Sequence, residues 1–220
     1  MKPSTAFARM DVGIGPLYPV VDNLNLLKRL LAFGVRTVQL RVKDPLHPNL
    51  DRIIKDAVEC GRLCQAQVFI NDHWQKALDA GAYGIHLGQD DLQTADLDAI
   101  ARAGVRLGVS TRTSDELDLA LDLAPSYLAI GHIFPTPTKQ MPTLPQGIAQ
   151  LEKHLKTVGG RIPTVAIGGI DLTNAPDVWR SGVDAIAVVR AVSQSCDLAA
   201  TLQSFEEVLS EEARDAAIAS

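Results

Sequence analysis

Three polar side chains, Gln39, Arg41 and Lys43, stand two residues apart at the end of a short apolar run. Residues two apart on an extended segment point to the same side, so we expect these three to face one space. Arginine pairs with phosphate through two hydrogen bonds, and lysine adds a compact positive charge. The spacing therefore predicts a site for phosphate or diphosphate; the alternative is a solvated strand end.

Further hydroxyls and a further cation occur later in the chain. Ser110 follows an apolar run, and Thr136, Thr138 and Lys139 lie together in one short segment. Hydroxyl donors and fixed cations suit an anion with several oxygen atoms. The Thr-Pro-Thr sequence is equally what a rigid loop contains. Only the joint occurrence of these groups after separate strands favours a shared anion site.

Two carboxylates, Asp72 and Asp91, also follow apolar runs. Taken singly, such an Asp is more often a turn residue or a helix cap. Beside an anion, two carboxylates repel it unless a cation lies between them, and carboxylates with phosphate oxygens are usual ligands of Mg²⁺. We therefore expect bound Mg²⁺–diphosphate. Gly168-Gly169 is either a tight turn or a second phosphate site, and two anion sites predict the joining of two phosphorylated molecules.

Eight short apolar runs are the candidate strands that must position these residues. Their nearly continuous apolar character is typical of strands covered on both faces, as in parallel sheets. We expect strands at residues 17–21, 37–40, 68–70, 84–87, 106–109, 127–130, 164–167 and 185–188. Amphipathic stretches, which predict helices, lie between them at 24–33, 51–65, 74–80, 95–103, 115–123, 148–158, 175–181 and 198–209.

Helix starts and stops support this division of the chain. Thr94, Ser114 and Thr173 are candidate N-caps, because their hydroxyls accept a backbone N–H of a first helical turn. Glycines stand at several expected helix ends, where the left-handed conformation stops a helix. These glycines are Gly34, Gly81, Gly104 and Gly182.

Eight strand–helix units predict a single (β/α)₈ TIM barrel of the α/β class, whose active site lies where the strands end. The alternative, an open doubly wound sheet, usually has fewer strands and a Gly-rich turn after the first one, and this chain has none there. We expect one domain over residues 1–220, with an N-terminal extension at 1–14 and a frayed tail at 211–220.

Composition excludes several classes of protein. The 220 residues carry a net charge of −5, and 46% of them are hydrophobic. A nucleic-acid binder is usually basic, a disordered chain is less apolar, and a membrane span needs a longer apolar run. We expect a cytoplasmic protein without nucleic-acid or membrane partners. The three cysteines are interpreted as free thiols.

Six blocks of the sequence resemble thiamine phosphate synthases. They read VQLRVKD at 38–44, FIND at 69–72, HLGQDD at 86–91, LGVST at 107–111, GHIFPTPTK at 131–139 and VAIGGI at 165–170. The resemblance implies a transferase that joins hydroxymethylpyrimidine diphosphate to hydroxyethylthiazole phosphate, giving thiamine phosphate and diphosphate. It also implies that Mg²⁺ assists a dissociative loss of diphosphate before the thiazole nitrogen attacks.

The same resemblance implies roles for individual residues. The pyrimidine diphosphate side is implied to consist of Gln39, Leu40, Arg41, Val42, Lys43, Asn71, Ser110 and Lys139, with Arg41, Lys43, Ser110 and Lys139 catalytic. Asp72 and Asp91 match the Mg²⁺ ligands, whereas Asp90 matches an acidic position that is not a ligand. The thiazole phosphate side is implied to consist of Thr136, Pro137, Thr138, Gly169, Val189 and Arg190.

Two features depart from this picture or compete with it. Arg190 stands where the family commonly has Ser, so it either binds the phosphate more strongly, fills its pocket, or points to solvent. A related thiazole tautomerase uses a His in a block like the one around His132, and a barrel that only binds such phosphates is a further alternative. His86 is expected in the core or the pocket floor, and residues 141–146 are the candidate lid.

Overall fold

The computed structural model describes residues 5–138, 143–210 and 212–213. Eight parallel strands form a closed barrel in which each strand pairs with the next and β8 pairs with β1. This architecture confirms the predicted (β/α)₈ TIM barrel. The strands are β1 (Leu17–Val21), β2 (Thr37–Leu40), β3 (Gln67–Asn71), β4 (Gly84–Leu87), β5 (Arg106–Thr111), β6 (Tyr127–Gly131), β7 (Thr164–Ile167) and β8 (Ala185–Val188).

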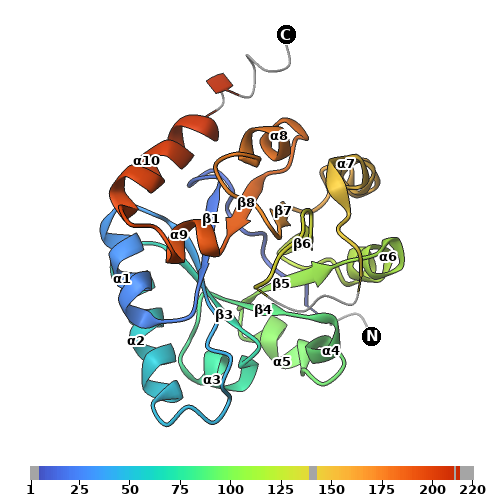
Figure 1. The fold of residues 1–220 in the computed structure, drawn as a ribbon. Helices are drawn as coiled ribbons and strands as arrows, with labels where there is room; N and C mark the ends of the chain where they lie inside the picture. The colour runs from blue at the N-terminus through green and yellow to red at the C-terminus, as the bar shows by residue number, and fades with distance from the viewer. Residues whose placement is uncertain (1–4, 139–142, 211, 214–220) are drawn as a thin grey trace.

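The helices lie outside the ring of strands (Figure 1). They are α1 (Leu24–Ala32), α2 (Leu50–Leu63), α3 (Trp74–Asp79), α4 (Gln89–Leu92), α5 (Leu97–Arg102), α6 (Ser114–Leu123), α7 (Gly147–Val158), α8 (Ala175–Arg180), α9 (Arg190–Ser193) and α10 (Leu198–Val208). In α1, the Asn23 side chain accepts the N–H of Leu26, and Leu27, Leu30 and Leu31 turn inward. None of the described helices is long and apolar enough to cross a membrane.

The strand alternation divides the apolar residues between two cores. Outward residues such as Leu40 and Ile70 pack between the barrel and the helices. Inward residues form a smaller core within the barrel, centred on Tyr18, Phe69 and Tyr127. Because both faces of the sheet are covered, the strands are apolar throughout rather than alternating.

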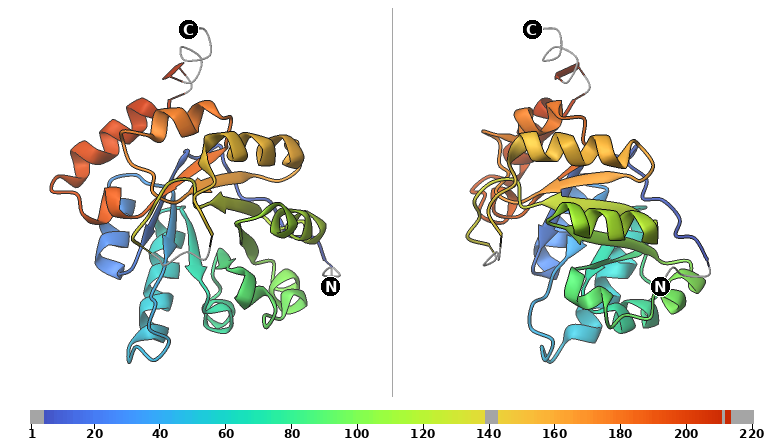
Figure 2. Two further views of the ribbon diagram at one scale, coloured as in Figure 1. Left: turned by 45° about the vertical axis from the view of Figure 1, so that its right-hand side comes forward. Right: turned by 90° about the vertical axis from the view of Figure 1, so that its right-hand side faces the viewer.

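The N-terminal segment crosses the end of the barrel opposite the carboxyl ends of the strands (Figure 2). The N–H of Met10 donates to the Ser126 carbonyl at 3.0 Å, and the Gln67 side chain bonds both backbone polar groups of Asp11. This segment therefore closes the amino end, and the carboxyl end stays available for a site. Residues 211 and 214–220 of the expected tail lie outside the described residues.

The structure corrects three details of the prediction. The short helices α4 and α9 were not expected, because four residues are too few to show a helical period. The side-chain caps of α5 and α6 are Asp96 and Thr113 rather than Thr94 and Ser114. Helix α8 begins after Asn174, and Thr173 instead donates to Asp171. The predicted stop glycines do have positive φ.

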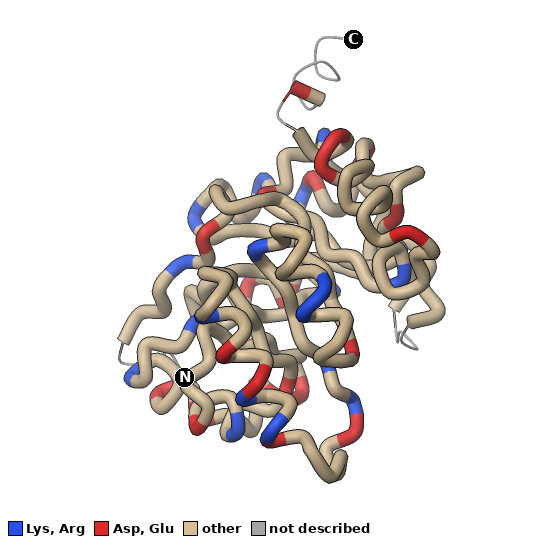
Figure 3. Tube along the Cα trace, turned by 90° about the vertical axis from the view of Figure 1, so that its left-hand side faces the viewer, with Lys and Arg blue, Asp and Glu red and all other residues tan. Residues whose placement is uncertain are grey.

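Basic and acidic residues are interspersed on the side of the barrel drawn in Figure 3. Part of this arrangement consists of pairs within helices, such as Arg62 with Glu59 in α2 at 2.7 Å and Arg52 with Asp56 at 3.8 Å. All four of these side chains are well exposed, so each pair adds little stability. The charges that bear on chemistry lie elsewhere, at the strand ends.

Candidate active site

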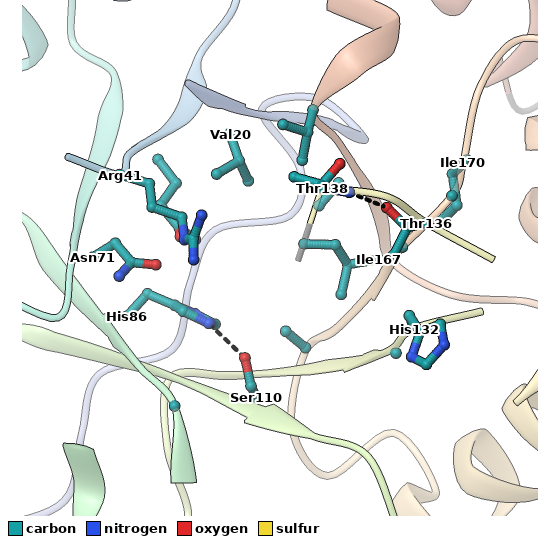
Figure 4. A pocket seen from close by; sticks show the side chains of 18 of the residues that line it. Val20, Arg41, Asn71, His86, Ser110, His132, Thr136, Thr138, Ile167 and Ile170 are labelled. Carbon is teal, nitrogen blue, oxygen red and sulfur yellow. Dashed lines mark hydrogen bonds between the residues drawn. The ribbon is translucent and has the colours of Figure 1, made fainter. Parts of the chain in front are cut away.

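A cavity of about 400 Å³ opens at the carboxyl ends of the strands. Figure 4 shows Arg41, directly after β2, facing the same space as Asn71, His86 and Ser110 from β3, β4 and β5. The predicted site residues that line this cavity are Gln39, Arg41, Asn71, Asp72, Asp91, Ser110, Thr136, Thr138, Gly169, Val189 and Arg190. The polar residues expected after separate strands are therefore brought together.

Four other predicted residues that the structure describes do not line the cavity: Leu40, Val42, Lys43 and Pro137. Leu40 and Val42 alternate with Gln39 and Arg41, so they point outward and pack toward the helices. Lys43 is not among the residues that line the cavity, because the strand ladder stops at Arg41, whose N–H still donates to the Val21 carbonyl at 2.7 Å. Lys43 is exposed, and its Nζ lies 3.5 Å from the Thr138 carbonyl.

The remaining predicted residues lie in the segment after β6. Pro137 is exposed beside the cavity, between Thr136 and Thr138, whose N–H donates to the Thr136 hydroxyl at 3.2 Å. Lys139 lies outside the described residues, as do residues 141–142 of the candidate lid. The described end of that lid is fixed at Gln146, whose Nε2 donates to the Gly131 carbonyl at 2.7 Å.

Three arginines line the cavity, and Arg41 is available to a ligand in a way that Arg112 is not. The guanidinium of Arg112 is paired with the Glu116 carboxylate through Nη2 and Nε, at 2.8 and 3.3 Å. Arg41 forms no ion pair with a described residue. It acts electrostatically on Asp72, whose pKa it lowers against the effects of burial and of Asp91. A cation without a paired carboxylate inside a cavity is suited to an anionic ligand.

Asp72 and Asp91 lie close together in the cavity. Burial raises the pKa of Asp72, the neighbouring Asp91 carboxylate raises it further, and Arg41 opposes both effects. Asp72 adopts a left-handed backbone, φ 64°, where β3 turns toward α3, and Asp91 lies in α4 directly after β4. Among the described residues, no group of three or more His, Cys, Asp or Glu could hold a metal ion.

This pair predicts a stability effect that does not depend on catalysis. Because the pKa of Asp72 is raised, protonation favours the folded chain, and that contribution is lost as the pH rises through the raised pKa. At neutral pH, Asp72→Asn is therefore expected to remove repulsion of about 1 kcal/mol and to raise Tm by roughly 2–4 °C in EDTA. Asparagine also tolerates the left-handed backbone.

Thermal unfolding with EDTA and with excess Mg²⁺ measures this effect. If the pair binds Mg²⁺, as expected from the sequence, excess Mg²⁺ should raise the Tm of the unchanged chain but not that of the variant, while Asp122→Asn, an exposed change on α6, should alter neither value. An unchanged or lower Tm of Asp72→Asn in EDTA would show that the two carboxylates do not repel each other.

Two glycines allow the end of β7 to approach the segment after β6. A Cβ on Gly168 would lie 2.3 Å from the His132 Cβ, and one on Gly169 would lie 2.7 Å from the Pro135 carbonyl oxygen. Both have positive φ, 106° and 69°. Glycine is therefore required at both positions, and it leaves the backbone there bare toward the cavity.

Asp171 was missed from the sequence, although it lines the cavity next to these glycines. It accepts hydrogen bonds from the N–H and the hydroxyl of Thr173 at 2.9 and 2.6 Å. These bonds lower the pKa of Asp171, and the nearby Arg190 lowers it by a smaller amount. The Asx-type turn in Asp-Leu-Thr-Asn after the glycine pair was the available indication. Arg190 lines the same cavity, near enough to Asp171 to contribute to the lowering of its pKa.

His132 also lines the cavity and is buried. Burial lowers its pKa, so the ring favours its neutral form, and its Nδ1 has no hydrogen-bond partner among the described residues. His86, expected in the core or the pocket floor, lies at the cavity floor, where its Nε2 is 2.8 Å from the Ser110 hydroxyl.

Comparison with known proteins agrees with this geometry. A family model described as thiamine monophosphate synthase matches residues 17–192. Thiamine-phosphate synthases of Cronobacter sakazakii and Salmonella schwarzengrund are 53% and 54% identical, over 87% and 85% of this chain and 91% and 89% of their own lengths. A thiamine phosphate pyrophosphorylase structure from Pyrococcus furiosus superposes with a TM-score of 0.77 at 29% identity, covering 90% of this chain and 96% of its own.

A more distant structure shares the fold alone. A 3-hexulose-6-phosphate synthase superposes with a TM-score of 0.67 at 15% identity, covering 89% of this chain. The relatives that are alike in sequence, by contrast, are named for one activity. They support the synthase prediction over the tautomerase and the binding-only alternatives. The chain therefore belongs to the thiamine monophosphate synthase family, and it is a transferase of thiamine phosphate synthesis.

Proposed function

We propose that this transferase joins hydroxymethylpyrimidine diphosphate to hydroxyethylthiazole phosphate and that it binds the diphosphate together with Mg²⁺. One observation carries the proposal: Arg41, which forms no ion pair with a described residue, lines one cavity at the strand ends together with Asp72 and Asp91. A cation and two acids in the same cavity suit an anionic group whose charge is partly neutralised by a metal.

The two carboxylates fit Mg²⁺. Magnesium is usually held by one or two protein carboxylates, with phosphate oxygens and water completing the octahedron. Burial and then repulsion from Asp91 raise the pKa of Asp72, and a divalent cation between the carboxylates would remove that repulsion. Bound there, Mg²⁺ would neutralise charge on the departing diphosphate. Asp90 lies on the same short helix, but the family pattern favours Asp91 as the ligand.

The protein's own residues then stabilise the leaving diphosphate and orient the two substrates. The carbon–oxygen bond to diphosphate breaks with its electron pair on the leaving oxygen, and the thiazole nitrogen donates its lone pair to the carbon. No proton has to be removed from that nitrogen, so a general base is not required. Arg41 stabilises the leaving group, and Asn71 and Ser110 offer hydrogen bonds beside it. The family pattern adds Lys43 and Lys139 from the rim.

The thiazole phosphate would bind on the other side of the cavity. Thr136 and Thr138 supply hydroxyls, and the backbone at Gly169 is bare enough for close approach of an anion. Val189 and Arg190 lie next to them, at the start of α9. The two substrates would thus meet between the β2–β5 side and the β6–β8 side of the barrel mouth, which holds them in line.

Arg190 provides a direct test of this second subsite. If its guanidinium binds the phosphate, Arg190→Ala should raise KM for the thiazole phosphate about tenfold, because one charge-assisted hydrogen bond is lost. Arg190→Ser, which restores the residue common in the family, should recover part of that loss. Steady-state kinetics with each substrate varied separately measure both. An unchanged KM in both variants would exclude a phosphate contact.

The order of bond breaking has its own test. An electron-withdrawing substituent on the pyrimidine ring destabilises a pyrimidine-centred cation, so the single-turnover rate should fall steeply along a series of such substrates. Binding of the substituted diphosphates should change little, because Arg41 and the carboxylates contact the other end of the molecule. A rate that does not respond to the substituent would instead favour direct displacement by the thiazole nitrogen.

A further inference from the structure

A chain of hydrogen bonds crosses the floor of the cavity and joins two residues of the proposed pyrimidine site. From β2, Gln39 Nε2 donates to the Tyr18 hydroxyl at 3.3 Å, which lies 2.8 Å from the Tyr127 hydroxyl. Tyr127 in turn lies 2.7 Å from His86 Nδ1, and His86 Nε2 lies 2.8 Å from the Ser110 hydroxyl. The chain thus links Gln39 to Ser110 through three residues that have no role so far.

The linking residues are buried and closely confined. Tyr18 and Tyr127 are 1% and 0% exposed, and His86 is 6% exposed. The rings of His86 and Tyr127 stack with their centroids 5.6 Å apart. A Cβ on Gly108 would lie 2.2 Å from the Tyr127 ring and 2.5 Å from its hydroxyl oxygen. Glycine at this inward position of β5 gives Tyr127 its space, so the hydroxyl has one place to lie.

With the Gln39 amide oriented so that its Nε2 donates to Tyr18, counting protons decides which group donates in each hydrogen bond of this series. Burial raises the pKa of both tyrosines, so each hydroxyl keeps one proton to donate. Tyr18 accepts from Gln39, and its remaining hydrogen-bond partner among the described residues is Tyr127. It must therefore donate to Tyr127, because an unpaired buried donor costs about 1–3 kcal/mol. Tyr127 then donates its own proton to His86 Nδ1.

We infer that His86 is a positioning residue, held as the neutral Nε2–H tautomer, which makes the Ser110 hydroxyl a donor toward the substrate. With Nδ1 accepting from Tyr127, the ring proton sits on Nε2 and donates to the Ser110 oxygen. The Ser110 proton is then directed away from His86, toward an acceptor atom of the pyrimidine diphosphate. The inference rests on the proposed function for the identity of that substrate.

The same series of hydrogen bonds couples the orientation of the Gln39 amide to the donor role of the Ser110 hydroxyl. Gln39 donates an N–H to Tyr18, its amide also acts on the Tyr127 hydroxyl, whose pKa it lowers, and its carbonyl oxygen remains for the cavity. If its amide were reversed, every bond in the chain would reverse, and Ser110 would donate to His86 and present lone pairs to the substrate. A single amide orientation on β2 thus decides what Ser110 offers on β5. Substrate recognition at these two positions is one event rather than two.

The tautomer can be observed directly in the ligand-free protein. Long-range ¹H–¹⁵N correlation spectra of the chain labelled with ¹⁵N-histidine distinguish a protonated from an unprotonated ring nitrogen, and the His86 signals are identified by their loss in His86→Gln. We expect protonated Nε2 and unprotonated Nδ1. An Nδ1–H tautomer, or protons on both nitrogens, overturns the inferred direction. This experiment requires no variant to be active.

Tyr127→Phe tests the coupling, with Tyr83→Phe as the matched control. Tyr83 belongs to the same aromatic cluster and packs edge-on against Phe69. Its hydroxyl donates to Gln67, which is not part of the hydrogen bonds between Gln39 and Ser110. Tyr127→Phe should lose the single His86 tautomer and raise KM for the pyrimidine diphosphate about fivefold, the value of one hydrogen bond, with KM for the thiazole phosphate unchanged. Tyr83→Phe should change none of these.

Different results would contradict the inference about His86 and the proposed function. An enzyme that couples both substrates but holds His86 as the Nδ1–H tautomer contradicts the inference and leaves the function intact. The inference is equally contradicted if Tyr127→Phe changes both KM values alike, since a general loss of packing has that effect. A chain that does not couple the two substrates contradicts the proposed function, whatever the His86 tautomer is.

Discussion

Arg41→Gln is expected to lower kcat by on the order of 10²- to 10³-fold, the usual cost of removing one group that stabilises charge in the transition state. Negative charge on the diphosphate grows as its bond to carbon breaks. The lost interaction is therefore stronger in the transition state than in the bound substrate, and kcat should fall more than KM rises. Glutamine keeps much of the length of the side chain and removes the charge.

A second consequence of Arg41→Gln is a shift in pH dependence. Arg41 holds the pKa of Asp72 down against burial and against Asp91, so its loss raises that pKa further. If the proposed Mg²⁺ site is correct, the acid limb of the activity should move to higher pH, because a carboxylate must be ionised to act as a metal ligand. The control is Arg52→Gln on α2, whose side chain is 83% exposed. If Arg41→Gln retains full kcat, Arg41 does not stabilise the transition state.

Asp91→Asn is expected to weaken the apparent affinity for Mg²⁺ by about 100-fold, at the upper end of what loss of a residue supporting a metal site costs. Asparagine has nearly the same shape, so the change tests charge and metal binding rather than packing. The diagnostic feature is recovery: activity lost at low Mg²⁺ should return in part at high Mg²⁺. Activity titrated against Mg²⁺ at saturating substrates measures this.

The matched control is the adjacent residue. Asp90 lies in the same helix, α4, and lines the same cavity, but the proposed metal site does not include it. Asp90→Asn should therefore change the Mg²⁺ titration by no more than about threefold, in line with a modest electrostatic effect of a nearby charge. If Asp90→Asn has the larger effect, the ligand has been assigned to the wrong residue of the pair.

The barrel was predictable because its strands are buried on both faces. Continuous apolar runs marked all eight, and the glycines after the helices marked the connections between them. The site followed from the same reasoning, since polar residues directly after strands, such as Asn71 and Ser110, meet at one end of a barrel. The alternation of side chains separates Arg41 from Leu40 and Val42 just as a strand requires.

What the sequence missed depends on contacts between distant segments. The hydroxyls of Tyr18 and Tyr127 meet across 109 positions of the chain, and each residue alone is an ordinary inward aromatic. Lys43 was placed by extending strand alternation beyond the point where the ladder ends. The shape of the Gly168-Gly169 turn is set by its packing against His132 and Pro135, which no local pattern records.

The central claim is that the barrel mouth holds a Mg²⁺–diphosphate beside a thiazole phosphate. The most direct test is an assay of the purified chain with both phosphorylated substrates, following thiamine phosphate and diphosphate together, with Mg²⁺ and with EDTA. We predict that the two products form in equal amounts, that both substrates are required, and that EDTA abolishes turnover. Equal turnover in EDTA, or conversion of the thiazole phosphate without the pyrimidine diphosphate, would contradict this account.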